Sequence, residues 1–173
     1  MKMIMNRNKK HQVIDNFLPE HNLKNLQDLM LGEDFPWFYA PNVNILDKNT
    51  TPSDLFYFTH LFHHNNVPTS NLYETICINL LSFMDIKSLI RVKGNMYPNQ
   101  GIQKLNGFHK DFTYSHKGAI FYLNTNNGKT LLDNDIKIDS VENRLLLFDP
   151  SLEHDSENCT DQKIRCNINI NYF

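Results

Sequence analysis

The stretch that decides the fold lies near the end of the chain and reads Lys163-Ile164-Arg165-Cys166-Asn167-Ile168-Asn169-Ile170-Asn171. Its even positions are apolar and its odd positions are polar, which is the period of a β-strand with two unlike faces. A strand that is buried on both sides usually reads apolar throughout, so we expect the odd face to line a wet cavity or solvent. The even face is expected to pack into a core.

Similar short runs of strand-forming residues precede this strand from residue 88 onward. Turn residues separate them, including Asp149-Pro150 and residues 126–128. Regularly spaced short strands joined by such turns indicate a sandwich or barrel. With the last strand included, the predicted runs are Ser88–Tyr97, Gly118–Asn124, Thr130–Leu132, Ile136–Ile138, Arg144–Phe148 and 163–172.

The first half of the chain has a mixed pattern that includes two helices. Residues 18–32 and 69–84 both place apolar side chains near helical spacing, whereas the aromatic segments 37–39 and 55–62 favour strand or loop. Two helices followed by a set of short strands predict a mainly β, α+β fold. We expect a jelly roll supported by helices on one face.

Length and charge limit the class of protein further. The chain has 173 residues, of which 40% are hydrophobic and 21% charged, and its formal net charge is −2. These values suit one globular domain, expected over residues 1–173, with a helical and aromatic support region in 1–87 and a β core in 88–173. The balanced charge offers no broad cationic surface for nucleic acid. No apolar run approaches the roughly 20 residues that cross a bilayer.

The cysteines and the first residues favour a reducing compartment. Cys77, Cys159 and Cys166 are odd in number and lack CxxC spacing. The polar, basic segment 1–10 has no apolar stretch typical of a secretory signal. We therefore predict a cytoplasmic protein with reduced thiols and no membrane association.

A metal site is indicated by His109-Lys110-Asp111, which places an imidazole and a carboxylate two residues apart. On an extended strand, side chains two apart point to the same face and can reach one ion. His154, after the Asp149-Pro150 turn, is the candidate third ligand. Two histidines and one carboxylate leave open coordination positions and select non-haem Fe(II) for O2 chemistry. Arg165, one of four arginines, follows eleven residues later and is suited to clamp a carboxylate.

These residues, in this order, resemble the Fe(II)/2-oxoglutarate-dependent dioxygenases, and specifically their prolyl 4-hydroxylase-like branch. The resemblance covers about residues 88–173 and extends to compact members of the family in bacteriophages. It implies a double-stranded β-helix (jelly roll, cupin-like), with iron held by the catalytic residues His109, Asp111 and His154. The stretches that resemble the family's HxD, YLN, GGxT, (N/D)RLxxF and H…R elements are Phe108–Phe112, Ala119–Asn124, Asn127–Thr130, Asn143–Phe148 and His154–Arg165.

The resemblance also implies a co-substrate site for 2-oxoglutarate. Arg165 is expected to bind its distal carboxylate, and Tyr122, in the YLN element, to contact the same carboxylate. Tyr97 or Asn95, which share a strand face, are expected to reach its metal-bound end, and Asn167 to touch co-substrate or substrate. The reaction consumes O2, converts 2-oxoglutarate to succinate and CO2, and hydroxylates a substrate C–H bond, with ascorbate as a candidate reductant. Asn127 replaces the first glycine of GGxT.

The substrate is left open between a peptidyl residue, proline included, and a small molecule. Other readings of the same residues are a catalytically inactive jelly-roll binding or structural module, and a nucleic-acid demethylase of the same superfamily. The absence of a basic surface counts against the latter. A structural Zn²⁺ site fits less well, because such sites favour four closed ligands with thiolates. The sequence leaves the oligomeric state open.

Overall fold

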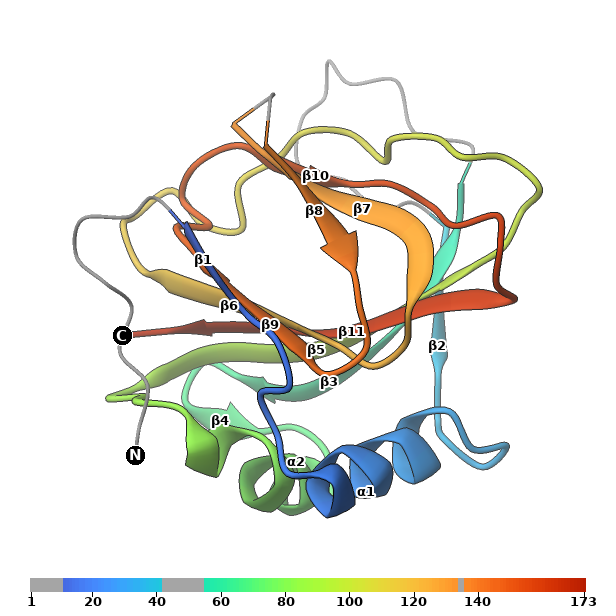
Figure 1. Cartoon of the computed structure of the whole chain (residues 1–173). Coiled ribbons are helices and arrows are strands. Elements are labelled where there is room, and N and C mark those ends of the chain that lie inside the picture. Colours follow the sequence, from blue (N-terminus) through green and yellow to red (C-terminus); the bar gives the residue numbers. More distant parts are fainter. Residues whose placement is uncertain (1–10, 42–54, 134–135) are drawn as a thin grey trace.

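The computed structural model describes residues 11–41, 55–133 and 136–173, and within them the chain forms two antiparallel sheets and two helices (Figure 1). The larger sheet has the strand order β1-β9-β6-β11-β5-β3-β2, with β4 paired to β3, and the smaller has the order β10-β7-β8. Figure 1 shows the two sheets facing each other, with the helices beneath the larger one. The predicted jelly roll with helices on one face is confirmed.

The strands have the following bounds in chain order: β1 His11–Ile14, β2 Phe38–Ala40, β3 Tyr57–His64, β4 Val67–Pro68, β5 Leu89–Pro98, β6 Lys117–Tyr122, β7 Asn126–Leu132, β8 Ile136–Ser140, β9 Arg144–Phe148, β10 His154–Ser156 and β11 Ile164–Tyr172. The helices are α1 Glu20–Met30 and α2 Tyr73–Asn79, and a 3-10 turn, η1, covers Leu81–Phe83.

Strand β11 lies in the interior of the larger sheet, between β5 and β6, and its two faces differ as the alternation predicts. Its apolar side chains, such as Ile168 and Ile170, join a core with the helices that includes Leu26 and Phe62. Its polar side chains point the other way, toward the smaller sheet, and are also buried. The core under the sheet therefore draws on both halves of the chain, while the opposite face of the sheet is free to carry polar residues.

Helix α1 packs closely on the sheet where β5 carries a glycine. A Cβ added at Gly94 would lie 2.8 Å from the Met30 Cε atom and 3.3 Å from the Phe62 ring. Hydrogen bonds join the two helices, because Asn22 and Asn25 each donate from the side-chain amide to Asn79 Oδ1 at 3.0 Å. These contacts fix the helical layer against the outer face of the sheet.

Two local predictions were wrong, and one strand was missed. The helix expected over 69–84 is shorter, because the backbone leaves helical geometry at Leu80 (φ −132°, ψ −59°) before η1. Residues 126–128 do not form a turn but begin β7, with an irregular register between Asn126 and Lys129 against β8. Strand β1, which the pattern of the first half did not indicate, pairs with β9 at the sheet edge.

The turn between β3 and β4 has a clear sequence cause. Asn65 and Asn66 have φ values of 50° and 62°, and asparagine tolerates this left-handed region better than most residues. The turn returns the chain so that His64 pairs with Val67.

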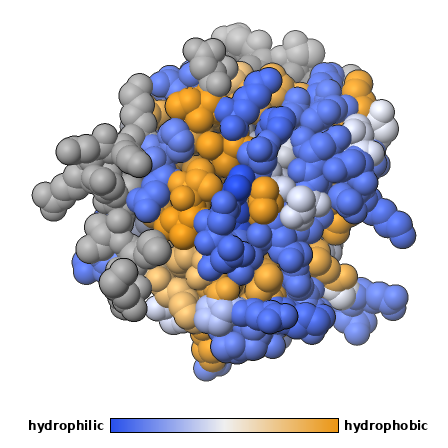
Figure 2. All heavy atoms as spheres, viewed as in Figure 1, coloured by the Kyte–Doolittle hydropathy of each residue, from blue (hydrophilic) through white to orange (hydrophobic). Residues whose placement is uncertain are grey.

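The surface is largely hydrophilic on the face shown in Figure 2, with hydrophobic residues gathered near its centre. None of the helices in residues 11–41, 55–133 and 136–173 is long and apolar enough to cross a membrane.

Candidate metal centre

His109 and His154 are held side by side by their own backbones. His109 N donates to the His154 carbonyl at 2.9 Å, and His154 N donates to the His109 carbonyl at 3.0 Å, so that the ring centroids lie 4.4 Å apart. His154 begins β10, whereas His109 lies in the loop between β5 and β6, with this single bridge in place of the strand assumed from its sequence. The bridge brings together two residues that are far apart in the chain.

The tautomer of each histidine is set by a backbone carbonyl. His109 Nδ1 lies 3.2 Å from the Gly107 carbonyl, and His154 Nδ1 lies 3.0 Å from the Leu152 carbonyl. A carbonyl only accepts, so Nδ1 carries the hydrogen in each ring and the Nε2 lone pair is left for a ligand.

Asp111 completes the cluster. One candidate ligand atom from each of His109, Asp111 and His154 can be chosen so that all three lie within 4.8 Å of one another. The distance from His109 Nε2 to Asp111 Oδ1 is 4.0 Å. Asp111 Oδ1 also contacts Arg91 Nη2 at 2.5 Å, and Asp111 Oδ2 accepts from Asn169 Nδ2 at 3.2 Å.

The charge states of these groups suit a cation. Burial, with His154 nearby, lowers the pKa of His109 to about 4, and burial also lowers the pKa of His154, so both rings are neutral at pH 7. Burial alone would raise the pKa of Asp111, but the nearby positive charge of Arg91 outweighs it and holds that pKa well below its usual range. The cluster therefore offers two neutral imidazoles and one carboxylate.

A chain of hydrogen bonds extends from Asp111 along the polar face of β11. Asn169 donates to Asp111, Asn171 Nδ2 donates to Asn169 Oδ1 at 2.6 Å, and His116 Nε2 contacts Asn171 Oδ1 at 2.7 Å. His116 Nδ1 lies 2.8 Å from the Tyr114 carbonyl at the far end. Because the Asp111 carboxylate can only accept, the orientations of the Asn169 and Asn171 amides are fixed.

Arg165 lies in the same cavity and is fully buried. Its Nε donates to Ser140 Oγ and its Nη2 to Thr130 Oγ1, both at 2.9 Å. Nη1 is buried and has no partner among the described residues. A buried guanidinium with an unused donor is costly, so this position calls for an anionic ligand.

A glycine makes room for that arginine. A Cβ added at Gly128 would lie 2.8 Å from Arg165 Cδ and 2.7 Å from the Glu157 carbonyl oxygen. The Gly of the GGxT-like element is therefore needed for the close passage of the Arg165 side chain.

The other predicted co-substrate residues take different places around Arg165. The rings of Tyr97 and Tyr122 lie 5.3 and 5.8 Å from its guanidinium carbon. Tyr97 and Asn95 line the cavity, and Asn95 Nδ2 donates to Asn167 Oδ1 at 3.1 Å. Tyr122 stands behind Thr130, because its hydroxyl donates to Thr130 Oγ1 at 2.7 Å and Thr130 is the residue that lines the cavity.

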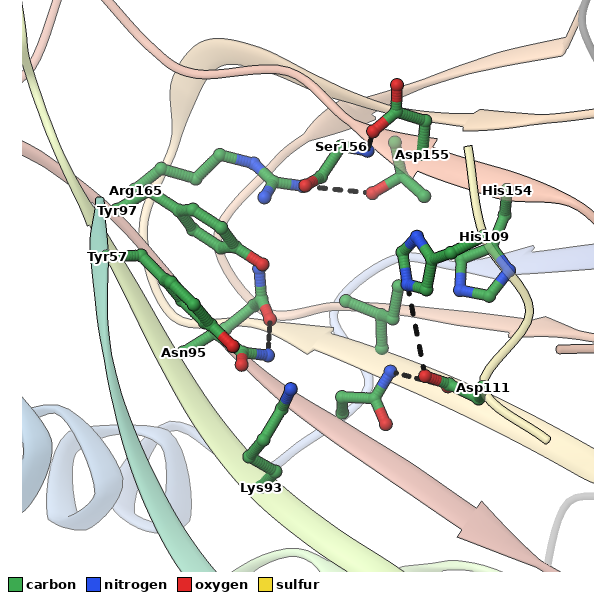
Figure 3. A pocket seen from close by; sticks show the side chains of 14 residues that line it. Tyr57, Lys93, Asn95, Tyr97, His109, Asp111, His154, Asp155, Ser156 and Arg165 are labelled. Carbon is green, nitrogen blue, oxygen red and sulfur yellow. Dashed lines mark hydrogen bonds and ion pairs between the residues drawn. The ribbon is translucent and has the colours of Figure 1, made fainter. Parts of the chain in front are cut away.

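Several cavity residues were missed by the sequence analysis, namely Tyr57, Lys93, Thr130, Asp155 and Ser156. Two of them could have been predicted as cavity residues from the sequence. Thr130 lies within the GGxT-like element, and Lys93 shares the strand face of Asn95 and Tyr97. Tyr57 had no such signal, because its place depends on the pairing of β3 with β5. All five line the same cavity as the histidines, about 450 Å³ in volume and partly open to solvent, and Figure 3 shows Tyr57 and Lys93 on the side of it opposite the histidines.

Asp155 fastens the loop that carries His109. Its Oδ2 accepts from Gly107 N at 3.1 Å and its Oδ1 from Ser156 N at 2.7 Å. Burial nevertheless raises the pKa of Asp155 to about 6. The carboxylate thus ties β10 to the segment just before His109.

Comparison with solved structures identifies the fold. A 2OG-Fe(II) oxygenase family oxidoreductase of Burkholderia pseudomallei is similar over 96% of this chain and 86% of its own, with a TM-score of 0.70 and 10% identity. A prolyl hydroxylase of Trichoplax adhaerens, solved with a hypoxia inducible factor oxygen degradation domain peptide fragment, is similar over 96% and 84% (TM-score 0.63, 19% identity). The viral collagen prolyl hydroxylase of Paramecium Bursaria Chlorella virus-1, in complex with 2OG, is similar over 95% and 96% (TM-score 0.59, 13% identity).

These similarities confirm the predicted fold, which is that of the 2OG-Fe(II) oxygenases. No protein-family model matches the sequence, and a search of curated proteins finds no match.

Proposed function

We propose that the chain is an Fe(II)- and 2-oxoglutarate-dependent oxygenase that hydroxylates a substrate C–H bond. One observation carries this proposal: the ligand atoms of His109, Asp111 and His154 converge on the same cavity as the unpaired Nη1 of buried Arg165. A metal triad and a buried cation on one cavity match the two ends of a metal-bound dicarboxylate.

The donor set fits Fe(II). Both histidines hold Nδ1–H against a carbonyl and present a neutral Nε2, and Asp111 is anionic. Two imidazoles and one carboxylate are the ligand set of non-haem Fe(II) oxygenases and leave coordination positions for other ligands. Asn169 and Arg91, which contact the Asp111 carboxylate, are placed to orient it.

When bound, Fe(II) with 2-oxoglutarate and O2 supplies the oxidising chemistry, in which 2-oxoglutarate becomes succinate and CO2 and a C–H bond is hydroxylated. The chain's own share is positional. Arg165 neutralises and orients the distal carboxylate with a donor that is held in place by Thr130 and Ser140. Tyr97, Asn95 and Asn167 line the same cavity as Arg165 and the triad.

Tyr122 acts through Thr130 in this proposal. Its hydroxyl holds the Thr130 oxygen that also accepts from Arg165. This is a positioning role, in place of the direct carboxylate contact that the resemblance implied.

A peptidyl substrate, proline included, is supported by the fold's similarity to prolyl hydroxylases, one of them solved with a peptide. A small-molecule substrate is equally compatible with the cavity. The single-domain organisation, the use of ascorbate, a bacteriophage source and a cytoplasmic location stay predictions.

The test begins with metal analysis of protein purified without oxygen. We expect one Fe(II) per chain in the presence of 2-oxoglutarate, and release of succinate and CO2 when O2 and a reductant such as ascorbate are admitted. His109→Ala is expected to lose both properties. His21→Ala, an exposed histidine on α1, is the matched control and is expected to keep them.

Two outcomes would contradict the proposal. Normal 2-oxoglutarate turnover by His109→Ala would refute the iron assignment. Failure of the wild-type chain to bind stoichiometric Fe(II), even with 2-oxoglutarate, would favour a non-catalytic jelly-roll module instead.

A further inference from the structure

A second cation lines the cavity and has no role in the proposed machinery. Lys93 lies on β5 between Arg91 and Asn95 and shares their strand face. Within the residues that the structure describes, its ammonium forms no hydrogen bond and no ion pair. Figure 3 shows the side chain reaching into the cavity from below Tyr57 and Asn95. A lysine turned inward without a partner is rare in proteins.

The aromatic wall holds this ammonium in place. Lys93 Nζ lies 5.7 Å from the Tyr57 ring centroid, and the Tyr57 ring stacks on Tyr97 with centroids 5.4 Å apart. A cation over a ring face gains a modest stabilisation, less than a carboxylate would provide. Tyr57 therefore positions the Lys93 charge without neutralising it.

Neighbouring charges do not satisfy Lys93 either. Asp111 is the nearest candidate, but it is engaged by Arg91 and Asn169 and serves as a metal ligand in the proposed function. Arg91 adds a like charge. Burial, together with Arg91, lowers the pKa of Lys93 to about 8, so that the lysine is still mostly protonated at pH 7.

Lys93 is also too far along the sheet to duplicate Arg165. Arg165 pairs across the strands with Tyr97, and Lys93 pairs with Asn169. Four residues of strand separate these levels, about 13 Å at about 3.3 Å per residue. In Figure 3, Tyr97, Tyr57 and Asn95 lie between the two cations. Arg165 therefore binds the distal carboxylate of 2-oxoglutarate, and Lys93 is too distant to share it. Lys93 is available to bind a different anion.

We propose that Lys93 binds a carboxylate of the primary substrate and so selects substrates with an acidic group close to the reacting C–H bond. This inference rests on the proposed function and names the substrate class of that same site. The carboxylate belongs either to a small acid, such as a free amino acid, or to an acidic side chain of a peptide.

The experiment measures by calorimetry how tightly acids and their amides bind to anaerobic, Fe(II)-loaded protein. Saturating 2-oxoglutarate is present, so that Arg165 is occupied and cannot bind these probes. One arm compares free L-amino acids with their carboxamides. The other compares blocked peptides that differ only by Glu or Gln. We expect at least one acid to bind about tenfold more tightly than its amide, the effect of one charge-assisted hydrogen bond. The arm in which the preference is found identifies the source of the carboxylate.

Lys93→Met is the decisive variant, because it keeps the length of the side chain and removes the charge. We expect the preference for acids to fall to about one while the affinity for Fe(II) and 2-oxoglutarate is retained. Lys87→Met, an exposed lysine paired with Asp85, is the control and should keep the preference. Lys93→Arg is expected to restore part of it.

Three results would overturn the assignment. They are equal binding of every acid and its amide to the wild type, an unchanged preference in Lys93→Met, and loss of 2-oxoglutarate affinity in Lys93→Met, which would place Lys93 in the co-substrate site. If the wild type binds neither Fe(II) nor 2-oxoglutarate, the proposed function itself is refuted, and the substrate assignment with it.

Discussion

Arg165→Met tests the co-substrate anchor most directly. The substitution keeps an unbranched side chain in the space beside Gly128 but removes the charge and all five donors. It deletes a buried cation whose Nη1 has no partner, so the unliganded protein should fold. What disappears is the pair of charge-assisted hydrogen bonds to a carboxylate. At about 1.5–3 kcal/mol each, their loss weakens binding of 2-oxoglutarate by at least about 100-fold.

The assay is thermal unfolding of the metal-loaded, oxygen-free protein with and without 2-oxoglutarate. At a concentration of about 100 times the wild-type Kd, the ligand stabilises the wild type by about 2.7 kcal/mol. For a chain of this size that raises Tm by roughly 5–10 °C. For Arg165→Met the same concentration of 2-oxoglutarate is near or below the variant's own Kd. The rise in Tm should therefore shrink to about 1 °C or less.

Arg144→Met provides the matched control. Arg144 forms a surface ion pair with Asp15, with Nε and Oδ1 2.6 Å apart, and takes no part in the cavity. Its loss should lower Tm slightly and leave the 2-oxoglutarate shift intact. A full shift in Arg165→Met would show that the carboxylate is held elsewhere and would refute the reasoning.

Two further predictions concern the support of the triad and the effect of pH. Asn169→Leu removes the donor to Asp111, and we expect metal affinity, measured by Fe(II) titration without oxygen, to fall about 10- to 100-fold; unchanged affinity would mean that the amide does not orient the carboxylate. Burial lowers the pKa of His63, so the folded state disfavours the protonated form of this side chain. The stability that neutral His63 contributes to the folded state is therefore lost as the pH falls below about 6.5. His63→Gln should therefore flatten the decline of Tm between pH 7 and pH 5 in metal-free protein, and an equal decline in both proteins would contradict this assignment.

Local patterns predicted those parts of the molecule that depend on neighbours in sequence. The alternation of residues 163–171 indicates a strand with one apolar and one polar face, and β11 has both. Alternation works here because the strand period is a property of the backbone itself. The cluster of His109, Asp111 and His154 was also indicated, since the residue types and their order restrict the chemistry.

Predictions failed where a long-range contact overrides a local preference. Residues 126–128 read as a turn, yet pairing with β8 and the passage of Arg165 over Gly128 draw them into β7. The hydrogen bond of the Tyr122 hydroxyl to Thr130 was likewise not foreseen, while its contact with a carboxylate stays a prediction. Both outcomes depend on which strands lie side by side.

The sequence by itself determined the class of fold, the metal-binding residue types and the buried arginine, because strand period, ligand chemistry and charge are carried by single residues and their spacing. Only the tertiary structure decided what surrounds them. The pairing of β5 with β11 and β3 places Lys93 and Tyr57 in the same cavity as the triad, and the bridge between His109 and His154 closes a gap of 45 residues. The physical reason is that side chains on paired strands become neighbours only after the register is fixed.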